Sequence, residues 1–131
     1  MESRSRAAFL LLVLVQTMHS VEEYAFRLYD LLAPARFVSG LLGLERSAGF
    51  AIANAALVLF GLWCWFALVR RGRPPARAVA WAWAIVETAN GLGHVWLALA
   101  AGGYFPGLVT APLLIAVGLW LAFSLARKEP A

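Results

Sequence analysis

The feature that most constrains this chain is a succession of four apolar blocks, each about as long as a helix that crosses a lipid bilayer. They cover residues 7–26, 47–69, 77–99 and 108–125, and so use most of the 131 residues. Blocks of this length differ from the short amphipathic stripes by which soluble helical bundles bury one face. They predict an all-α, integral membrane bundle of four transmembrane helices, in a single domain covering residues 1–131.

The composition also indicates that lipid is the solvent. Hydrophobic residues make up 63% of the chain and charged residues 14%, which is more apolar surface than a soluble domain of this size can bury. The formal net charge of +4 does not indicate a nucleic-acid partner, because nearly all basic residues lie at the ends of the apolar blocks. The expected partner is membrane lipid. A lone cysteine, Cys64, excludes an intrachain disulfide.

The distribution of basic residues predicts how the bundle is oriented. If four helices cross, both termini and the second connection share one side of the membrane. That side holds most of the basic residues, so the positive-inside rule places both termini in the cytoplasm of a multi-pass inner (plasma) membrane protein. The cytoplasmic set is Arg4, Arg6, Arg70, Arg71, Arg73, Arg77, Arg127 and Lys128, and the opposite set is Arg27, Arg36 and Arg46.

The start of the chain imitates a secretory signal peptide, because Arg4 and Arg6 precede a short apolar run. However, no small-x-small cleavage pattern follows, and residues 16–23 are largely polar. We therefore expect an uncleaved helix whose second half is polar. The connection 27–46 mixes charged residues, proline and glycine with leucines and aromatics, which predicts a short helix in the membrane interface.

Two sets of polar residues interrupt the first and third blocks, where each titratable group costs about 2.5–3.5 kcal/mol on insertion into hydrocarbon. Spacings of three and four residues place the members of each set on one helical face. At a rise of about 1.5 Å per residue, both sets fall in one layer of the outer half of the bilayer, together with Asn54 of the second block. The sets are His19, Glu22 and Glu23, and Glu87, Asn90 and His94.

These residues, with a turn near the end of the chain, carry a resemblance to a known family. Residues 19–23 read His-x-x-Glu-Glu, Asn90 and His94 form Asn-x-x-x-His, and residues 104–110 read Tyr-x-Pro-Gly-x-x-Thr. With these three motifs in order, the chain resembles the HXXEE family of small bacterial integral membrane proteins. The resemblance implies a membrane protein with the named motif in its first helix, and it supplies no mechanism.

One hypothesis for the polar layer is a metal site. His and carboxylate side chains that converge from different helices of a bundle are the usual ligands of iron, manganese and zinc. The candidate ligands for such a divalent metal are His19, Glu23, Glu87 and His94, with Asn54 and Asn90 as their hydrogen-bond partners. The chain lacks the paired Glu-x-x-His motifs of soluble di-iron bundles.

A second hypothesis needs no metal, because a buried carboxylic acid beside a histidine is an acid-base pair. Such a pair can protonate or isomerise a lipophilic small molecule such as a lipid or terpenoid. Both enzyme hypotheses give catalytic roles to the same residues, and the sequence does not decide between them. The candidate catalytic residues are His19, Glu22, Glu23, Glu87, Asn90 and His94.

Two further alternatives stay open. The same residues can relay protons or bind a cation in a small transporter or channel subunit, which would require a homodimer that Gly91 and Gly93 permit. In a purely structural role they fix helix packing, or the first helix stops near Ser20 and leaves its carboxylates in headgroup water. We favour an enzyme, because the polar residues gather in one layer instead of following a path across the bilayer.

The turn at residues 104–110 is predicted to be a tight outer loop. Pro106 and Gly107 are expected to reverse the chain, and Thr110 to cap or bond the backbone of the fourth helix. Because this turn lies at the mouth of the polar layer, a gating or substrate-contact role is also open.

Overall fold

The computed structural model describes residues 1–41 and 43–127, and every regular element in these ranges is helical, as predicted. Lys128, one of the basic residues assigned to the cytoplasmic side, lies outside the described residues. The elements are α1 (Ser3–Ala25), α2 (Leu28–Leu31), α3 (Ala33–Gly40), α4 (Arg46–Cys64), the π-helical segment η1 (Trp65–Val69), α5 (Ala76–Ala101) and α6 (Ala111–Ala126).

The helix boundaries are informative at three places. Helix α1 continues without a break to Ala25, so the alternative in which it stops near Ser20 is wrong, and both of its glutamates are buried. The expected interfacial helix of the connection 27–46 is divided into α2 and α3. Helix α6 begins only at Ala111, because residues 108–110 belong to the preceding turn.

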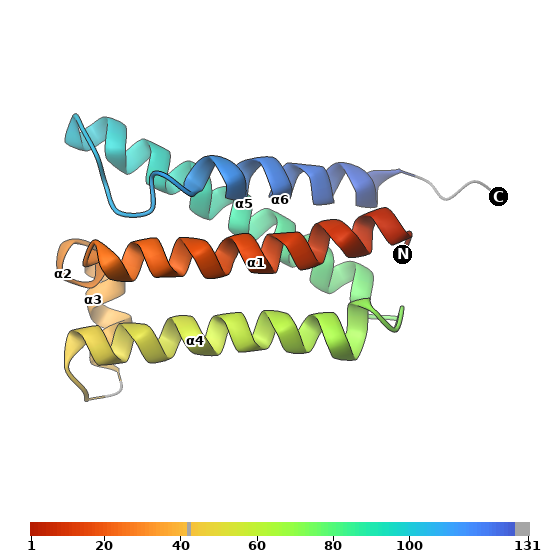
Figure 1. Cartoon of the computed structure of the whole chain (residues 1–131), viewed down its shortest axis with the longest axis horizontal. Coiled ribbons are helices and arrows are strands. Elements are labelled where there is room, and N and C mark those ends of the chain that lie inside the picture. Colours follow the sequence, from red (N-terminus) through yellow and green to blue (C-terminus); the bar gives the residue numbers. More distant parts are fainter. Residues whose placement is uncertain (42, 128–131) are drawn as a thin grey trace.

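Helix α1 lies between α4 and α6, and α5 crosses behind α1 from the η1 end of α4 toward the opposite end of the bundle (Figure 1). The start of α1, the end of α6 and the α4–α5 connection lie at one end of the molecule (Figure 1). Helices α2 and α3 and the α5–α6 turn lie at the opposite end (Figure 1). The second half of α1, which carries the polar motif, is therefore directed toward the end at which the α5–α6 turn reverses the chain.

Glycines let α5 and α6 approach each other closely. A Cβ atom at Gly91 would lie 2.8 Å from the carbonyl oxygen of Ala111, and one at Gly118 would collide with Oγ1 of Thr88. Gly91 is thus used for packing within the chain, whereas Gly93 has open space beside it. Gly91 therefore faces α6 and is not free to permit the close approach of a second chain.

The apolar core is divided into two clusters. The larger one surrounds Phe9, Leu12 and Leu121 in the half of the bundle that contains the chain ends. The smaller one joins α2 and α3 to α4 through Tyr29 and Phe50. Between these clusters, α1 contributes buried polar residues, and α5 and the α5–α6 turn contribute others. The candidate site lies in this polar layer.

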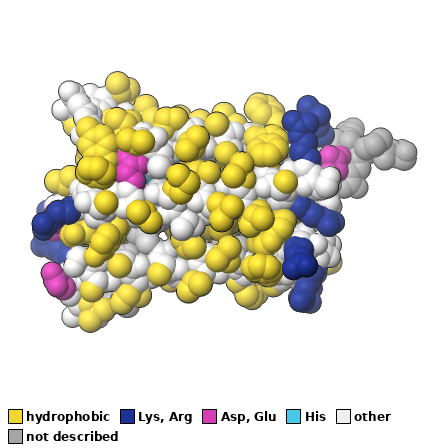
Figure 2. Space-filling model, in the orientation of Figure 1, with side chains coloured by type: hydrophobic (Ala, Val, Ile, Leu, Met, Phe, Trp, Pro, Cys, Tyr) yellow, Lys and Arg dark blue, Asp and Glu magenta, His cyan; other side chains and the backbone are white. Residues whose placement is uncertain are grey.

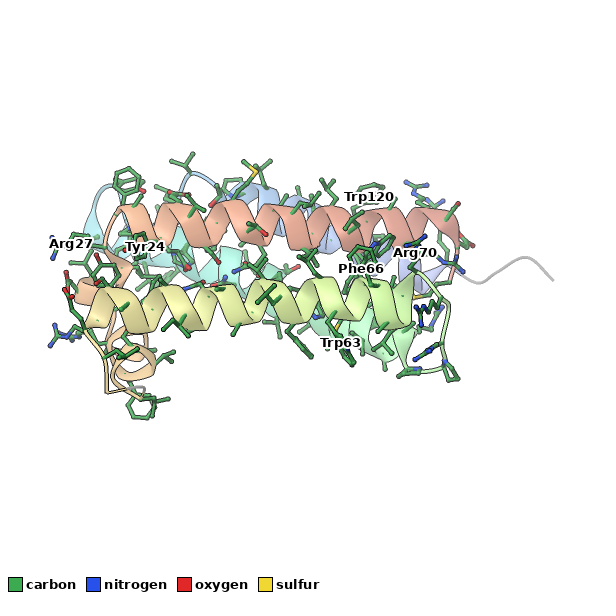
Figure 3. All side chains as sticks on the ribbon, turned by 60° about the horizontal axis from the view of Figure 1, so that its bottom comes forward. Tyr24, Arg27, Trp63, Phe66, Arg70 and Trp120 are labelled. Carbon is green, nitrogen blue, oxygen red and sulfur yellow. The ribbon has the colours of Figure 1, made fainter. Side chains whose placement is uncertain are left out.

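Within the described residues, one continuous helical run, Arg46–Val69 in α4 and η1, is long and apolar enough to cross a membrane by length and composition. Helix α6 is apolar but shorter. Hydrophobic side chains cover the middle of the visible surface, and Lys and Arg gather toward its two ends (Figure 2). Trp63, Phe66 and Trp120 lie toward the end marked by Arg70 (Figure 3).

Candidate metal centre

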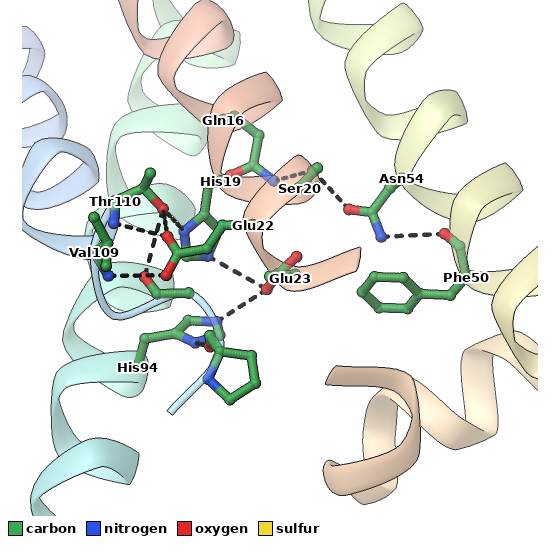
Figure 4. Close-up of polar contacts among 12 residues, drawn as sticks. Gln16, His19, Ser20, Glu22, Glu23, Phe50, Asn54, His94, Val109 and Thr110 are labelled. Carbon is green, nitrogen blue, oxygen red and sulfur yellow. Dashed lines mark hydrogen bonds and ion pairs between the residues drawn. The ribbon is translucent and has the colours of Figure 1, made fainter. Parts of the chain in front are cut away.

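Three buried side chains, His19, Glu23 and His94, converge between α1 and α5 (Figure 4). Oε1 of Glu23 lies 3.3 Å from Nε2 of His19 and 3.0 Å from Nε2 of His94. The potential ligand atoms of the three residues all lie within 4.8 Å of one another. The imidazole rings meet edge to face, with centroids 4.6 Å apart and planes at 85°. This arrangement directs two nitrogens and one oxygen toward a common point.

The outer ring nitrogen of His94 is held by the backbone of the α5–α6 turn. Its Nδ1 lies 2.6 Å from the carbonyl oxygen of Pro106. A carbonyl oxygen can only accept a hydrogen bond, so Nδ1 of His94 carries the proton and donates it. In the neutral ring, Nε2 of His94 then presents a lone pair to Glu23.

The outer nitrogen of His19 is held by a side chain of the same turn. Its Nδ1 lies 2.7 Å from Oγ1 of Thr110, and that hydroxyl lies 2.6 Å from Oε2 of Glu22. A hydroxyl has one proton, which it donates to the acceptor-only carboxylate, so it accepts a hydrogen bond from Nδ1 of His19. Nε2 of His19 therefore also presents a lone pair to Glu23 when the ring is neutral.

The two imidazoles thus place two lone pairs against one carboxylate oxygen, and the group needs positive charge at its centre. Nε2 of His19 is buried and has no hydrogen-bond partner among the described residues. Bound protons or a metal cation can supply the missing charge. Histidines that bind metals commonly donate their other nitrogen to a carbonyl or to a carboxylate, which fixes the tautomer. His94 follows this pattern directly, and His19 follows it through Thr110.

Glu22 serves a different purpose from its neighbour Glu23. Its Oε1 accepts hydrogen bonds from the hydroxyl of Tyr104, at 2.8 Å, and the backbone N–H of Val109, at 3.0 Å. Its Oε2 accepts from the backbone N–H of Thr110, at 2.9 Å, and from the hydroxyl of the same residue. Burial and the hydrogen bond to Glu22 raise the pKa of Tyr104 to about 12. Glu22 therefore anchors the α5–α6 turn to α1.

Gly107 allows that turn to lie directly on the histidines. Its φ of +94° is strained for any residue with a Cβ atom. An added Cβ would lie 2.5 Å from Nδ1 of His94 and 2.8 Å from Cε1 of His19. The residue that best fits this position is therefore glycine, for both its backbone conformation and the space it leaves.

The remaining predicted residues lie beside the three-residue group. Glu87 is buried and its Oε2 lacks a hydrogen-bond partner among the described residues, but it is not one of the three converging ligands. Asn90 lines the cleft that also contains Glu23 and His94. Asn54 accepts a hydrogen bond of 2.7 Å from Ser20, which links α4 to the polar layer (Figure 4).

Sequence reasoning did not identify the role of the turn. Thr110 was expected to cap or bond the backbone of α6, but its hydroxyl joins Glu22 to His19. Its bond toward the carbonyl oxygen of Gly107, at 3.5 Å, is much the longest of the three. The Tyr-x-Pro-Gly-x-x-Thr pattern was the available signal, because Tyr104, Pro106, Gly107 and Thr110 each contact the site.

Comparison with known proteins gives one result. No curated protein and no solved structure matches the chain. A family model described as "Protein of unknown function with HXXEE motif" matches residues 10–121, which include both histidines, both motif glutamates and the α5–α6 turn. The chain therefore belongs to the HXXEE family.

Proposed function

We propose that this chain is a multi-pass inner membrane protein that binds one divalent metal ion through His19, Glu23 and His94. The observation that carries the proposal is the direction of the two imidazoles. Both Nδ1 atoms are engaged with the α5–α6 turn, and both Nε2 atoms face the same oxygen of Glu23. Three donors that need a cation therefore meet in a buried place.

Two of the three distances between ligand atoms match those around a tetrahedral metal, and all three lie within 4.8 Å. Ligand atoms about 2.0–2.1 Å from a tetrahedral zinc ion lie about 3.3 Å from one another. The oxygen of Glu23 lies 3.3 and 3.0 Å from the two nitrogens. Two histidines and one carboxylate are the ligands of many catalytic zinc sites and of non-haem iron sites. Zinc and iron are therefore the first candidates, and manganese is the third.

A site with three protein ligands supports an enzyme over a structural metal site. Structural zinc is almost always held by four protein ligands, whereas catalytic metals keep a position for water or substrate. A metal with such a position polarises a bound oxygen or activates water. Because the site is surrounded by apolar helices, we propose a lipophilic substrate.

The surface of the bundle supports four transmembrane helices. Large apolar side chains are exposed on all the long helices, in amounts that a soluble monomer rarely shows. Leu99 of α5 and Phe123 of α6, for example, are 72% and 68% exposed. The start of α1, the end of α6 and the α4–α5 connection share one end of the molecule, and this end holds most of the basic residues that the structure describes. We propose that this end faces the cytoplasm.

Metal content tests the proposal directly. Wild-type protein purified in detergent is incubated separately with zinc, iron and manganese, freed of excess metal, and measured by elemental mass spectrometry. We expect about one metal ion per chain in the wild type, and less than about a tenth of that in His19→Ala and His94→Ala. Glu87→Gln is the matched control, because it alters a buried acid outside the converging group and should retain metal.

A folded wild-type protein that binds none of these metals would overturn the metal site. The two histidines would then share protons with Glu23, and the acid-base hypothesis would replace the metal site. If Glu87→Gln loses as much metal as His19→Ala, the proposed set of three ligands is wrong.

The tautomers provide a second test that does not depend on activity. The chain contains only two histidines, so nuclear magnetic resonance of protein labelled with ¹⁵N-histidine resolves each ring. In rings that carry a single proton, we expect that proton on Nδ1 in both histidines, and zinc should shift mainly the Nε2 resonances. A ring that carries its single proton on Nε2 would contradict the assignment.

Topology is tested by labelling single cysteines in intact cells. In a Cys64→Ser background, Arg71→Cys lies at the proposed cytoplasmic end and Glu45→Cys at the opposite end. A membrane-impermeant maleimide should label only the Glu45→Cys variant before lysis and both variants after lysis. The reverse pattern would invert the orientation, and labelling of both before lysis would contradict four crossings.

A further inference from the structure

A cleft beside the candidate metal centre separates α4 from α5. The two helices approach each other near η1 and diverge toward the other end of the bundle (Figure 1). The space between them has a volume of about 330 Å³, which is at the small end of the range for ligand sites. Helix α1 forms its floor, and α2 and α3 close one end. Its wall includes Glu23, Val38, Ala53, Leu57, Asn90 and His94.

The cleft reaches the candidate metal centre from one side only. Glu23 and His94 line it, whereas His19 does not. The α5–α6 turn covers the opposite side of the histidines, because Gly107 lies against both rings. A molecule in the cleft would therefore meet the face of the group formed by Glu23 and His94.

The lining residues divide the cleft into a polar part and an apolar part. The polar part contains amide groups together with Glu23 and His94, and it contains no lysine or arginine. Without lysine or arginine, this part has no permanently charged side chain to pair with an anionic headgroup, such as a phosphate or a fatty acid carboxylate. Amides and a carboxylate do offer hydrogen bonds to an uncharged hydroxyl. The apolar part, which includes Val38 and Leu57, suits a hydrocarbon chain.

We infer that the cleft binds an uncharged single-chain amphiphile, of the fatty alcohol class, which enters sideways from the lipid between α4 and α5. Its hydroxyl lies against Glu23 and His94, and its hydrocarbon chain extends along the apolar part toward the lipid. This inference rests on the proposed function for its membrane placement and names the substrate class of the same site. Lipid occupancy and metal content are separate measurements, so the two proposals can fail separately.

Photo-crosslinking in detergent or bicelles tests the inference. The probe is a fatty alcohol with a diazirine in its chain, and the comparison probes are the matching diazirine fatty acid and a diazirine phosphatidylcholine. We expect saturable labelling by the alcohol on peptides that line the cleft, at least tenfold above either comparison probe. An unlabelled fatty alcohol in excess should compete with it.

Two tryptophan substitutions on neighbouring residues of α4 provide the matched controls. Ala53 lines the cleft, whereas Ile52 is 49% exposed and does not line it. Ala53→Trp should lower alcohol labelling at least tenfold, and Ile52→Trp should change it less than twofold. Both variants should keep the metal content of the wild type, which shows that they fold.

His19→Ala separates this inference from the proposed metal site. Because His19 does not line the cleft, this variant should lose metal and keep saturable alcohol labelling. Labelling that does not saturate, or that Ala53→Trp leaves unchanged, would overturn the inference. Preferential labelling of the cleft by the acid or the phospholipid would overturn the choice of an uncharged single-chain ligand.

Discussion

Helix α1 presents two adjacent glutamates to two different halves of the molecule. Successive residues on a helix point about 100° apart, so Glu22 faces the α5–α6 turn while Glu23 faces the histidines and the α4–α5 cleft. Glu22 accepts four hydrogen bonds, three of them shorter than 3.0 Å. The contacts of Glu23 with the Nε2 atoms of the two histidines both use Oε1, at 3.3 and 3.0 Å.

The difference separates an anchor from a ligand. A carboxylate surrounded by hydrogen-bond donors is satisfied and fixes the backbone around it. A buried carboxylate that faces two imidazole lone pairs is not satisfied until a cation or protons arrive. The motif therefore contains one glutamate that holds the site together and one that carries its chemistry. Four variants test this division, from the largest expected effect to the smallest.

Metal affinity should depend much more on Glu23 than on Glu22. Glu23→Gln removes a proposed ligand and should weaken zinc binding by more than about 100-fold, whereas loss of an outer partner costs about 10- to 100-fold. Glu22→Gln, which disturbs Thr110 and through it His19, should fall within the smaller range. Competition against a chromophoric zinc chelator measures both affinities. Equal losses, or a larger loss in Glu22→Gln, would remove the distinction between anchor and ligand.

Stability without metal should show the opposite order. Glu22→Gln turns an amide N–H₂ toward groups that are themselves donors, and hydrogen bonds to a charged group contribute about 1.5–3 kcal/mol each. We expect a loss of at least about 3 kcal/mol in the free energy of unfolding. Glu23 faces two imidazole lone pairs when both rings are neutral, so Glu23→Gln should cost less than about 1 kcal/mol.

Chemical unfolding in detergent with a chelator present, followed by circular dichroism, measures these values. Glu45→Gln is the control, because Glu45 is exposed and its substitution should cost almost nothing. A greater destabilisation by Glu23→Gln than by Glu22→Gln would mean that Glu23 already has strong partners in the metal-free protein.

Gly107→Ala should destabilise the α5–α6 turn through both backbone strain and steric clash. Gly102 has a similar positive φ of +67° but nothing within 4 Å of an added Cβ, so Gly102→Ala reports the strain alone, about 1–2 kcal/mol. Gly107→Ala adds contact with both histidines and should cost at least about 1 kcal/mol more. Gly103→Ala, which has open space and no positive φ, should be nearly neutral. Equal costs at Gly102 and Gly107 would show that the turn does not press on the rings.

The helices and the polar layer were predictable because both follow from distances along the chain. The helical repeat places residues three and four apart on one face, and the rise per residue gives their depth. This reasoning identified His19, Glu23 and His94, which the structure brings together. It also grouped Asn54 with them, and Asn54 is joined to α1 through Ser20.

The division of roles was not predictable, because it depends on how the helices cross. Glu22 and Glu23 are both spaced to approach His19 from the next turn, so spacing alone cannot say which one does. The same uncertainty made Glu87 a candidate ligand, although α5 does not turn it into the converging group. The carbonyl oxygen of Pro106, which orients His94, is a backbone atom that no residue type reveals.

Tyr104→Phe gives the smallest expected effect and tests a single contact of the anchor. Burial and the Glu22 carboxylate raise the pKa of Tyr104 to about 12, above the usual value of about 10. Its stabilising effect is therefore present below pH 10 and is lost as the pH rises through about 12. Glu22 keeps three other hydrogen bonds in the variant, so the loss near neutral pH should be about 1 kcal/mol. Tyr104→Phe should also remove the component of the tyrosinate absorbance that titrates near pH 12. If that component remains in the variant, Tyr104 does not donate to Glu22 and the anchor is made by residues 109 and 110 alone.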